Sequence, residues 1–114
     1  MTPAAFRKLA LSLDGAAEGA HGGHVDFRAG GKVFATLGYP NKEWGMAKLT
    51  PEQQQMLVAA EPDMFVPVKG AWGLRGATSV RLAEVDARTM RSALTMAWRN
   101  VTAPKPNKPR RVAA

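Results

Sequence analysis

Residues 64–82 of the chain read MFVPVKGAWGLRGATSVRL, and this stretch decides how the fold is interpreted. The runs 64–68 and 77–82 are rich in residues that favour β-strands. Between them, KGAWGLRG (69–76) holds three glycines, one tryptophan and two cations. A connection between neighbouring strands needs only about two to five residues. We therefore expect 69–76 to be a loop that is longer than a simple connection and that serves either as a folded-back anchor or as a contact surface.

The segment before this stretch begins with a predicted amphipathic helix. Thr2 suits the N-cap and Pro3 the first helical position. Apolar residues then recur at helical spacing, at Phe6, Leu9, Ala10 and Leu13. The spacing predicts a helix over 3–13 that ends at Asp14-Gly15. The small, Gly-rich segment 16–24 is expected to be a loop.

A β-hairpin is the clearest element in the sequence. Residues 25–29 and 32–37 alternate apolar and polar side chains, and Gly30-Gly31 can supply the positive φ angles of a tight turn. A second turn signal at 39–42 leads into a third strand around 44–49. Three antiparallel strands in sequence predict a meander.

Two more helices are predicted around the opening stretch. Thr50-Pro51 repeats the Thr-Pro opening, with Gln53 placed for a capping box, and Met56, Leu57 and Ala60 give a narrow apolar face. Asp86 is expected to cap the last helix. The buried face of that helix is predicted at Met90, Ala93, Leu94, Ala97, Trp98 and Val101.

Together these elements predict a single α+β domain over residues 1–103. We expect a curved antiparallel sheet of about five strands, covered on one face by the N- and C-terminal helices. A short helix is inserted between the third and fourth strands. Residues 104–114 are Pro-rich and basic, and we expect a disordered tail there.

Composition narrows the classes of function. The 114 residues suit one domain, the absence of Cys excludes disulfides and thiolate chemistry, and no apolar run is long enough for a membrane span. We expect a cytoplasmic monomer without a membrane partner. The net charge is +7, but four cations lie in the tail, which leaves +3 for the body. The tail can either add phosphate contacts or act as a solvated extension without a partner.

Metal binding and catalysis are weakly supported. His21 and His24 are three residues apart, but a structural metal site needs about four ligands, so solvated or backbone-bound histidines are the favoured interpretation. Ser12, Ser79 and Ser92 lie in different elements without an obvious base. We expect no metal, no cofactor and no enzymatic activity.

Basic side chains are the better functional candidates. Lys69 and Arg75 flank Trp72, and arginines with an aromatic ring can hold phosphate and stack on a base. One face of the last helix carries Arg88, Arg91 and Arg99. The alternatives are that Trp72 plugs the edge of the core and that the helical arginines form an ordinary solvated face.

Four motifs in linked order resemble the MmcQ/YjbR family: GKVFATL (31–37), LTPEQQQML (49–57), FVPVKGAWGLRGATSVRL (65–82) and ALTMAWRNVTAPK (93–105). The resemblance implies a frataxin-like (CyaY-like) fold. It also implies DNA binding, by analogy with a double-wing arrangement. The wings would be hairpin loops, one with Gly30, Gly31 and Lys32, the other spanning 69–75. The acidic iron-binding ridge of frataxin-type proteins is missing, because the first helix carries Arg7 and Lys8.

The resulting hypothesis is a non-enzymatic DNA-binding protein of low sequence specificity. It would contact phosphates through basic hairpin loops and the C-terminal helix. The candidate residues are Lys32, Lys69, Trp72, Arg75, Arg88, Arg91 and Arg99. The alternative is a protein- or small-ligand-interaction module of frataxin-like fold with no nucleic-acid role.

Overall fold

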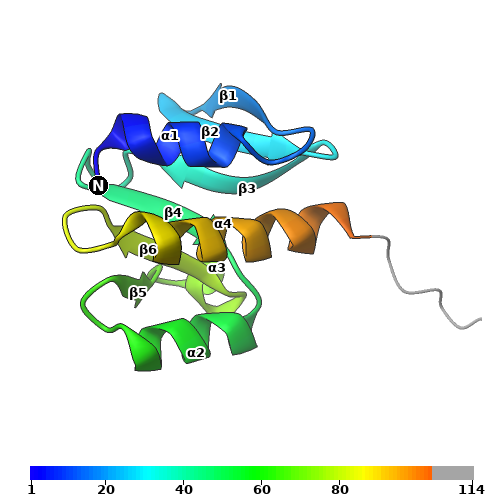
Figure 1. Ribbon diagram of the computed structural model, residues 1–114. Helices are drawn as coiled ribbons and strands as arrows, with labels where there is room; N and C mark the ends of the chain where they lie inside the picture. The colour runs from blue at the N-terminus through cyan, green and yellow to red at the C-terminus, as the bar shows by residue number, and fades with distance from the viewer. Residues whose placement is uncertain (104–114) are drawn as a thin grey trace, which may run out of the picture.

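The computed structural model describes residues 1–103, apart from the side chain of His21. The elements in chain order are α1 (Pro3–Leu11), β1 (Ala17–His21), β2 (His24–Ala29), β3 (Lys32–Leu37), β4 (Trp44–Lys48), α2 (Pro51–Ala60), β5 (Phe65–Pro67), α3 (Ala71–Leu74), β6 (Ala77–Arg81) and α4 (Ala87–Thr102). The strands form one six-stranded antiparallel sheet in the order β1-β2-β3-β4-β6-β5 (Figure 1). The predicted α+β class is confirmed, with one strand more than expected. The tail predicted at 104–114 lies outside the described residues.

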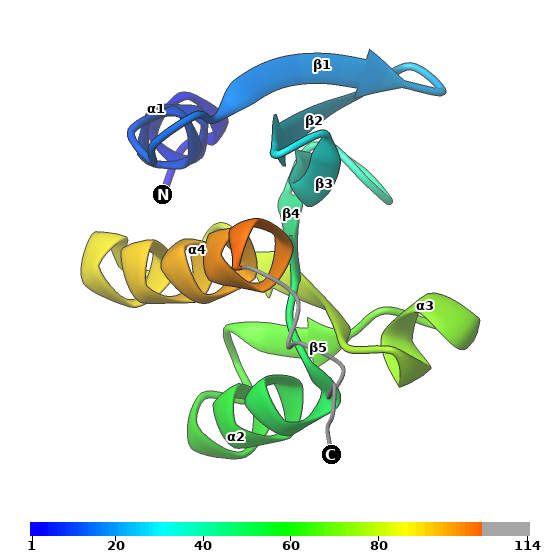
Figure 2. The same ribbon diagram turned by 90° about the vertical axis from the view of Figure 1, so that its right-hand side faces the viewer.

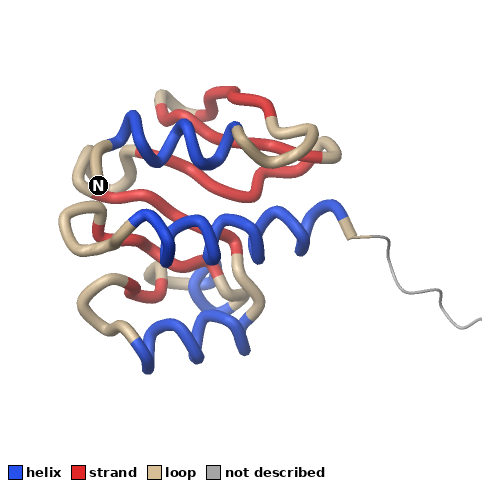
Figure 3. The backbone as a smooth tube through the Cα atoms, in the orientation of Figure 1, coloured by secondary structure: helices blue, strands red, loops and turns tan. Residues whose placement is uncertain are grey.

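The helices are distributed unequally over the two faces of the sheet. Figure 2 shows α1, α4 and α2 on one side and α3 on the other. Figure 3 shows the strands running behind α1 and α4, with α2 below them in this view. The main core lies between these helices and the sheet, and it includes every phenylalanine of the chain. The buried phenylalanines are Phe6, Phe27, Phe34 and Phe65.

Small residues on the inner face of the sheet let α1 and α4 approach it closely. Gly45 in β4 lies under the ring of Phe6, and a Cβ built at Gly45 would be 2.7 Å from Phe6 Cε2. Ala35 and Ala47 are fully buried on the same face, and α4 packs against β3 and β4. Of the predicted inner positions of α4, Met90, Ala93, Leu94 and Ala97 are buried, and Trp98 and Val101 are half-buried against the core.

The predicted β2–β3 hairpin is present, with φ of 60° at Gly30 and 80° at Gly31. Its register shifts inside the strands, because Phe27 pairs with Ala35 whereas Arg28 pairs with Val33. Phe34 is therefore an extra residue in β3, as in a β-bulge. Phe34 and Ala35 are both buried as a result, although they are consecutive.

Two expected loops contain regular structure. The prediction of a loop over 16–24 was wrong, because Ala17–His21 forms β1. The sequence of β1, AEGAH, has few strand-favouring residues, and the strand forms by backbone pairing with β2. The loop predicted at 69–76 contains the one-turn helix α3, and α1 ends at Leu11, two residues earlier than predicted.

Helix α2 differs from its prediction in the face that it buries. The capping box of Thr50 and Gln53 is present. The expected apolar face is wrong at two of its three residues, because Met56 is 55% exposed and Ala60 is also exposed, whereas Leu57 is half-buried against the core. Gln54 is the buried residue of this helix, and its amide donates hydrogen bonds to the carbonyls of Gly73 at 3.0 Å and Ala77 at 2.9 Å.

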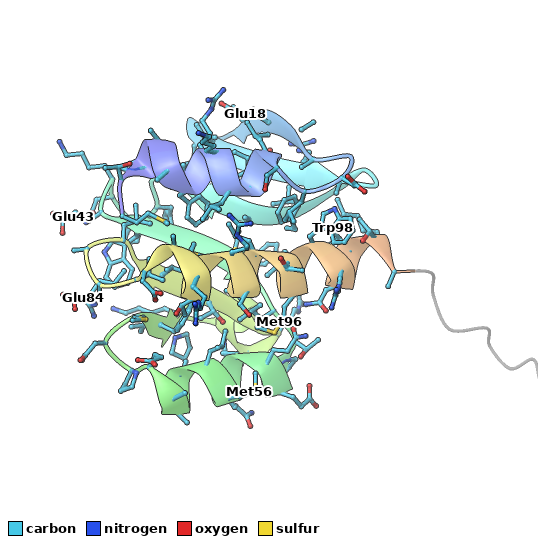
Figure 4. The ribbon with its side chains drawn as sticks, viewed as in Figure 1. Glu18, Glu43, Met56, Glu84, Met96 and Trp98 are labelled. Atoms are coloured by element: carbon cyan, nitrogen blue, oxygen red, sulfur yellow. The ribbon has the colours of Figure 1, made fainter. Side chains whose placement is uncertain are left out.

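Helix α4 is joined to the N-terminal part of the chain near its C-terminal end. The indole Nε1 of Trp98, labelled on α4 in Figure 4, donates to the carbonyl of Asp14 at 2.8 Å. This bond connects α4 to the segment between α1 and β1. Within residues 1–103, no helix has the length and apolar character needed to cross a membrane.

Two glycines of the KGAWGLRG stretch lie where no side chain fits. A Cβ built at Gly73 would be 1.6 Å from the carbonyl oxygen of Val68. At Gly76, φ is +112° and a Cβ would be 2.0 Å from the carbonyl oxygen of Leu49. The connection from β5 to β6 therefore includes two points of close backbone contact, which explain Gly73 and Gly76.

We expect Gly76→Ala to destabilise the protein more than Gly15→Ala does. Gly15 also has a positive φ, +73°, but a Cβ there meets nothing within 4 Å. Gly15→Ala should therefore cost about 1–2 kcal/mol of backbone strain. Gly76→Ala adds a backbone collision and should cost about 3 kcal/mol or more. Urea unfolding followed by tryptophan fluorescence measures both, and equal losses would contradict the close approach at Gly76.

Candidate functional site

The face of the sheet opposite α1 and α4 holds an open hollow of about 620 Å³. Side chains alternate along a strand, so Met46 and Lys48 point away from the core that Gly45 and Ala47 face. The hollow is lined by His24, Asp26, Arg28, Lys32, Val33, Thr36, Tyr39, Met46, Lys48, Val68, Lys69, Trp72, Ala77 and Ser79. These residues come from β2, β3, β4 and β6, from the β3–β4 connection and from the segment around α3.

The hollow is basic. Four cations line it, and of the nine Asp and Glu residues, all in the described part of the chain, only Asp26 lines it. With His24 neutral, the lining therefore has a formal charge of +3. Residues 1–103 as a whole also carry +3, so the charges elsewhere in the described chain balance. Figure 4 shows two of the other carboxylates, Glu43 and Glu84, together at one end of the molecule. The positive charge of the folded body is thus concentrated at the hollow.

Asp26 is already paired within the hollow. Its carboxylate is 2% exposed and accepts hydrogen bonds from Nε of Arg28 at 3.0 Å and from the Nη2 group at 3.1 Å. This hydrogen bonding, together with the negative charge, raises the pKa of Arg28. A Cβ at Gly19, which lies opposite on β1, would be 2.9 Å from the carboxylate, so glycine leaves room for the pair.

The cations gather at one end of the hollow. Strands β2 and β4 both run antiparallel to β3, so the end of β2, the start of β3 and the end of β4 lie together. Arg28, Lys32 and Lys48 occupy this end. Within residues 1–103, Lys32, Lys48 and Lys69 form no ion pair with a carboxylate. These three ammonium groups are therefore available to an anionic ligand.

The opposite end of the hollow carries an aromatic pair. The rings of His24 and Tyr39 meet edge to face, with 5.4 Å between their centroids. Lys48 and Trp44 are four residues apart on β4, which corresponds to about 13 Å along the strand. Tyr39 lies at the Trp44 end, because the amide of the adjacent Gly38 donates to the Trp44 carbonyl. The hollow therefore extends along the strands from a cationic end to an aromatic end.

Trp72 lies at the cationic end, at the rim of the hollow. Its side chain is 57% exposed, and Nζ of Lys48 lies 5.6 Å from the centroid of its ring. The alternative that Trp72 plugs the edge of the core is therefore wrong. The ring belongs to the surface that a ligand would meet.

Buried contacts fix the helix that carries Trp72. The amide of Gln54 bonds the Gly73 carbonyl within α3 and the Ala77 carbonyl just after it. Gly73 is itself buried against the backbone of Val68. The indole is thus attached to a short helix that is held by the Gln54 side chain of α2 and by the backbone of Val68, just after β5.

The structure divides the predicted binding residues between two surfaces. Lys32, Lys69 and Trp72 line the hollow together, and Arg75 is exposed at the C-cap of α3 without lining it. The arginines of α4 are exposed on the helix that covers the opposite face. These separated residues are Arg88, Arg91 and Arg99.

Among the cations and exposed aromatic residues of the hollow, sequence reasoning missed Arg28, Lys48 and Tyr39. Arg28 and Lys48 occupy alternate polar positions of predicted strands, so a signal existed. Periodicity separates the two faces of a strand without telling which one the helices leave open. The side chain of His21 is outside the described residues. Among those described, no group of three or more His, Cys, Asp or Glu could hold a metal ion.

Comparison with known proteins places this fold in a family. A sequence model of the YjbR family matches residues 11–100. The chain belongs to the YjbR family. The structure of this YjbR-family chain is also similar to the crystal structure of Deinococcus radiodurans protein DR2400, described as a DUF419 domain. The TM-score is 0.76 at 19% sequence identity, over 94% of this chain and 83% of DR2400, which shows a shared fold. No curated protein matches the sequence significantly.

We expect Gln54→Ala to destabilise this YjbR-family protein by about 1–3 kcal/mol, because two buried hydrogen bonds are lost. Gln55→Ala is the matched control, since Gln55 is exposed on the same helix and should change stability by less than about 0.5 kcal/mol. Thermal unfolding measures both variants. Equal melting temperatures for Gln54→Ala and the unmodified protein would show that this amide does not hold α3.

Proposed function

We propose that the protein binds DNA with low sequence specificity through the open face of the sheet. The observation that carries the proposal is the convergence of Lys32, Lys48 and Lys69 with Trp72 on one hollow whose one lining carboxylate is already paired. Lysine and aromatic side chains are the groups that bind a nucleic-acid backbone and its bases without reading sequence.

Low specificity follows from the kinds of side chain in the hollow. A lysine ammonium binds phosphate as a point charge, whereas the more discriminating base contacts are bidentate ones, such as an arginine guanidinium makes at a base edge. Arg28 is the one arginine that lines the hollow, and two of its hydrogen bonds go to Asp26. The groups that remain are suited to phosphates and to stacking.

The arginines of α4 are a separate surface in this proposal. They lie on the opposite side of the sheet from the hollow. A short DNA segment seated in the hollow would not reach them. Their contribution to DNA binding can therefore be distinguished from that of the hollow, because substitutions on the two surfaces can change the net charge by the same amount.

We expect the double variant Lys32→Glu/Lys69→Glu to weaken DNA binding at least about 10-fold at low salt and to flatten the salt dependence of log Kd by about 1.5 to 2. The matched control is Arg88→Glu/Arg91→Glu, which changes the net charge equally on exposed residues of α4. Fluorescence anisotropy with labelled DNA and the full chain measures both, and unfolding curves verify that each variant folds.

Two outcomes would contradict the proposal. Equal weakening by the lysine and arginine variants would show that net charge alone, and not the hollow, attracts DNA. No binding of unmodified protein at about 100 µM, the weak end of non-specific DNA affinity, would reject DNA binding itself.

A second candidate function is binding of a small anionic ligand in the same hollow. The volume of about 620 Å³ favours it, since small-molecule pockets measure about 300–1,000 Å³. Such a ligand would raise the melting temperature by an amount that grows with the logarithm of its concentration above Kd. Labelled DNA would then show no salt-dependent change in anisotropy.

A further inference from the structure

Two aromatic rings are exposed at the hollow. Trp72 at the cationic end and Tyr39 at the aromatic end are each 57% exposed. Trp44 lies on the same face of β4 as Met46, but the guanidinium of Arg81 lies 4.6 Å from the centroid of its ring and covers it. Trp72 and Tyr39 are therefore the rings that remain accessible for stacking.

The surface between the rings is largely apolar. This floor of the hollow is lined near its cationic end by Val33, Val68 and Ala77 and in its middle by Met46, with the small polar side chains of Thr36 and Ser79 on either side of Met46. Met46 is the centre of this floor, because it pairs with Thr36 on β3 and with Ser79 on β6. An apolar floor gains nothing from phosphates, and it suits the flat faces of unpaired bases.

The two forms of DNA meet such a surface differently. A duplex presents its phosphates outward and keeps its base faces stacked inside, so it can touch the lysines but not cover the floor or stack on the rings. A single strand exposes base faces and phosphates along the same chain. The lysines, the rings and the floor can therefore all be used at once by a single strand.

The position of Trp72 also reduces the cost of stacking. The ring lies within 5.6 Å of the Lys48 ammonium, and α3 is held by Gln54. A base on Trp72 and the phosphate next to it can thus be bound by groups that are already in place, which limits the loss of side-chain entropy on binding.

We infer that the hollow selects single-stranded over duplex DNA, with bases stacked on Trp72 and Tyr39 and phosphates bound by Lys32, Lys48 and Lys69. The inference rests on the proposed DNA-binding function and names the form of DNA that the site takes. The selectivity comes from the rings and the apolar floor, and the lysines contribute to both forms.

Fluorescence anisotropy with a labelled oligothymidylate and a labelled duplex of equal length, using the full chain, tests the inference. The single strand should bind more tightly. Trp72→Ala should weaken single-strand binding roughly 5- to 100-fold while changing duplex binding by less than about 2-fold. Its melting temperature should stay unchanged, because the ring is largely exposed.

Two further variants separate stacking from a general disturbance of α3. Trp72→Phe should retain most of the single-strand affinity, since a phenyl ring still stacks, and should lose the quenching of tryptophan fluorescence that a stacked base produces. Leu74→Ala is the matched control, because Leu74 is 82% exposed on the same short helix and does not line the hollow. It should leave single-strand binding unchanged.

The outcomes distinguish the inference from the function on which it rests. Duplex binding as tight as single-strand binding, or single-strand binding unaffected by Trp72→Ala, would overturn the inference and leave DNA binding intact. Thymidine monophosphate binding as tightly as the oligonucleotide would overturn it in favour of a free nucleotide. Failure to bind either form of DNA would overturn both.

Discussion

The close approach of α1 and α4 to the sheet depends on small residues at its centre. Phe6 fits against the sheet because Gly45 has no side chain, and α4 packs above Ala35 and Ala47. A larger residue at Gly45 would push α1 outward, since even a Cβ there would lie only 2.7 Å from the Phe6 ring. With these helices on one face, the core is complete and the opposite face of an antiparallel sheet can remain in solvent.

That one-sided covering gives the open face its character. Its cations lie at one end, its exposed rings lie at both ends, and Met46 lies between them with the small polar side chains of Thr36 and Ser79 beside it. An ordinary solvated sheet face would carry mixed charges, whereas this one carries the excess positive charge of the folded body around an apolar floor. A ligand with both phosphate and aromatic groups uses all of these features, which is why the proposals concern DNA.

A buried polar residue connects the open face to the helical layer. Gln54 belongs to α2, on the helical side, and its amide bonds the backbone of α3 and the residue that begins β6. The glycines at 73 and 76 allow the backbones to come close enough for these bonds. The position of Trp72 at the rim thus depends on a glutamine and two glycines that do not themselves line the 620 Å³ hollow.

Local patterns in the sequence determined the helices α1, α2 and α4, the β2–β3 hairpin and the α+β class, because capping residues, turn glycines and periodicity act between near neighbours. They placed Lys32, Lys69 and Trp72 as candidates. Only the tertiary structure decided that β1 is a strand, that Gln54 is buried, and that the α4 arginines lie away from the hollow. Each of these depends on contacts between residues far apart in the chain. For the same reason, the glycines of KGAWGLRG could be recognised as turn residues from the sequence, whereas packing decided whether its tryptophan faced the core or the solvent.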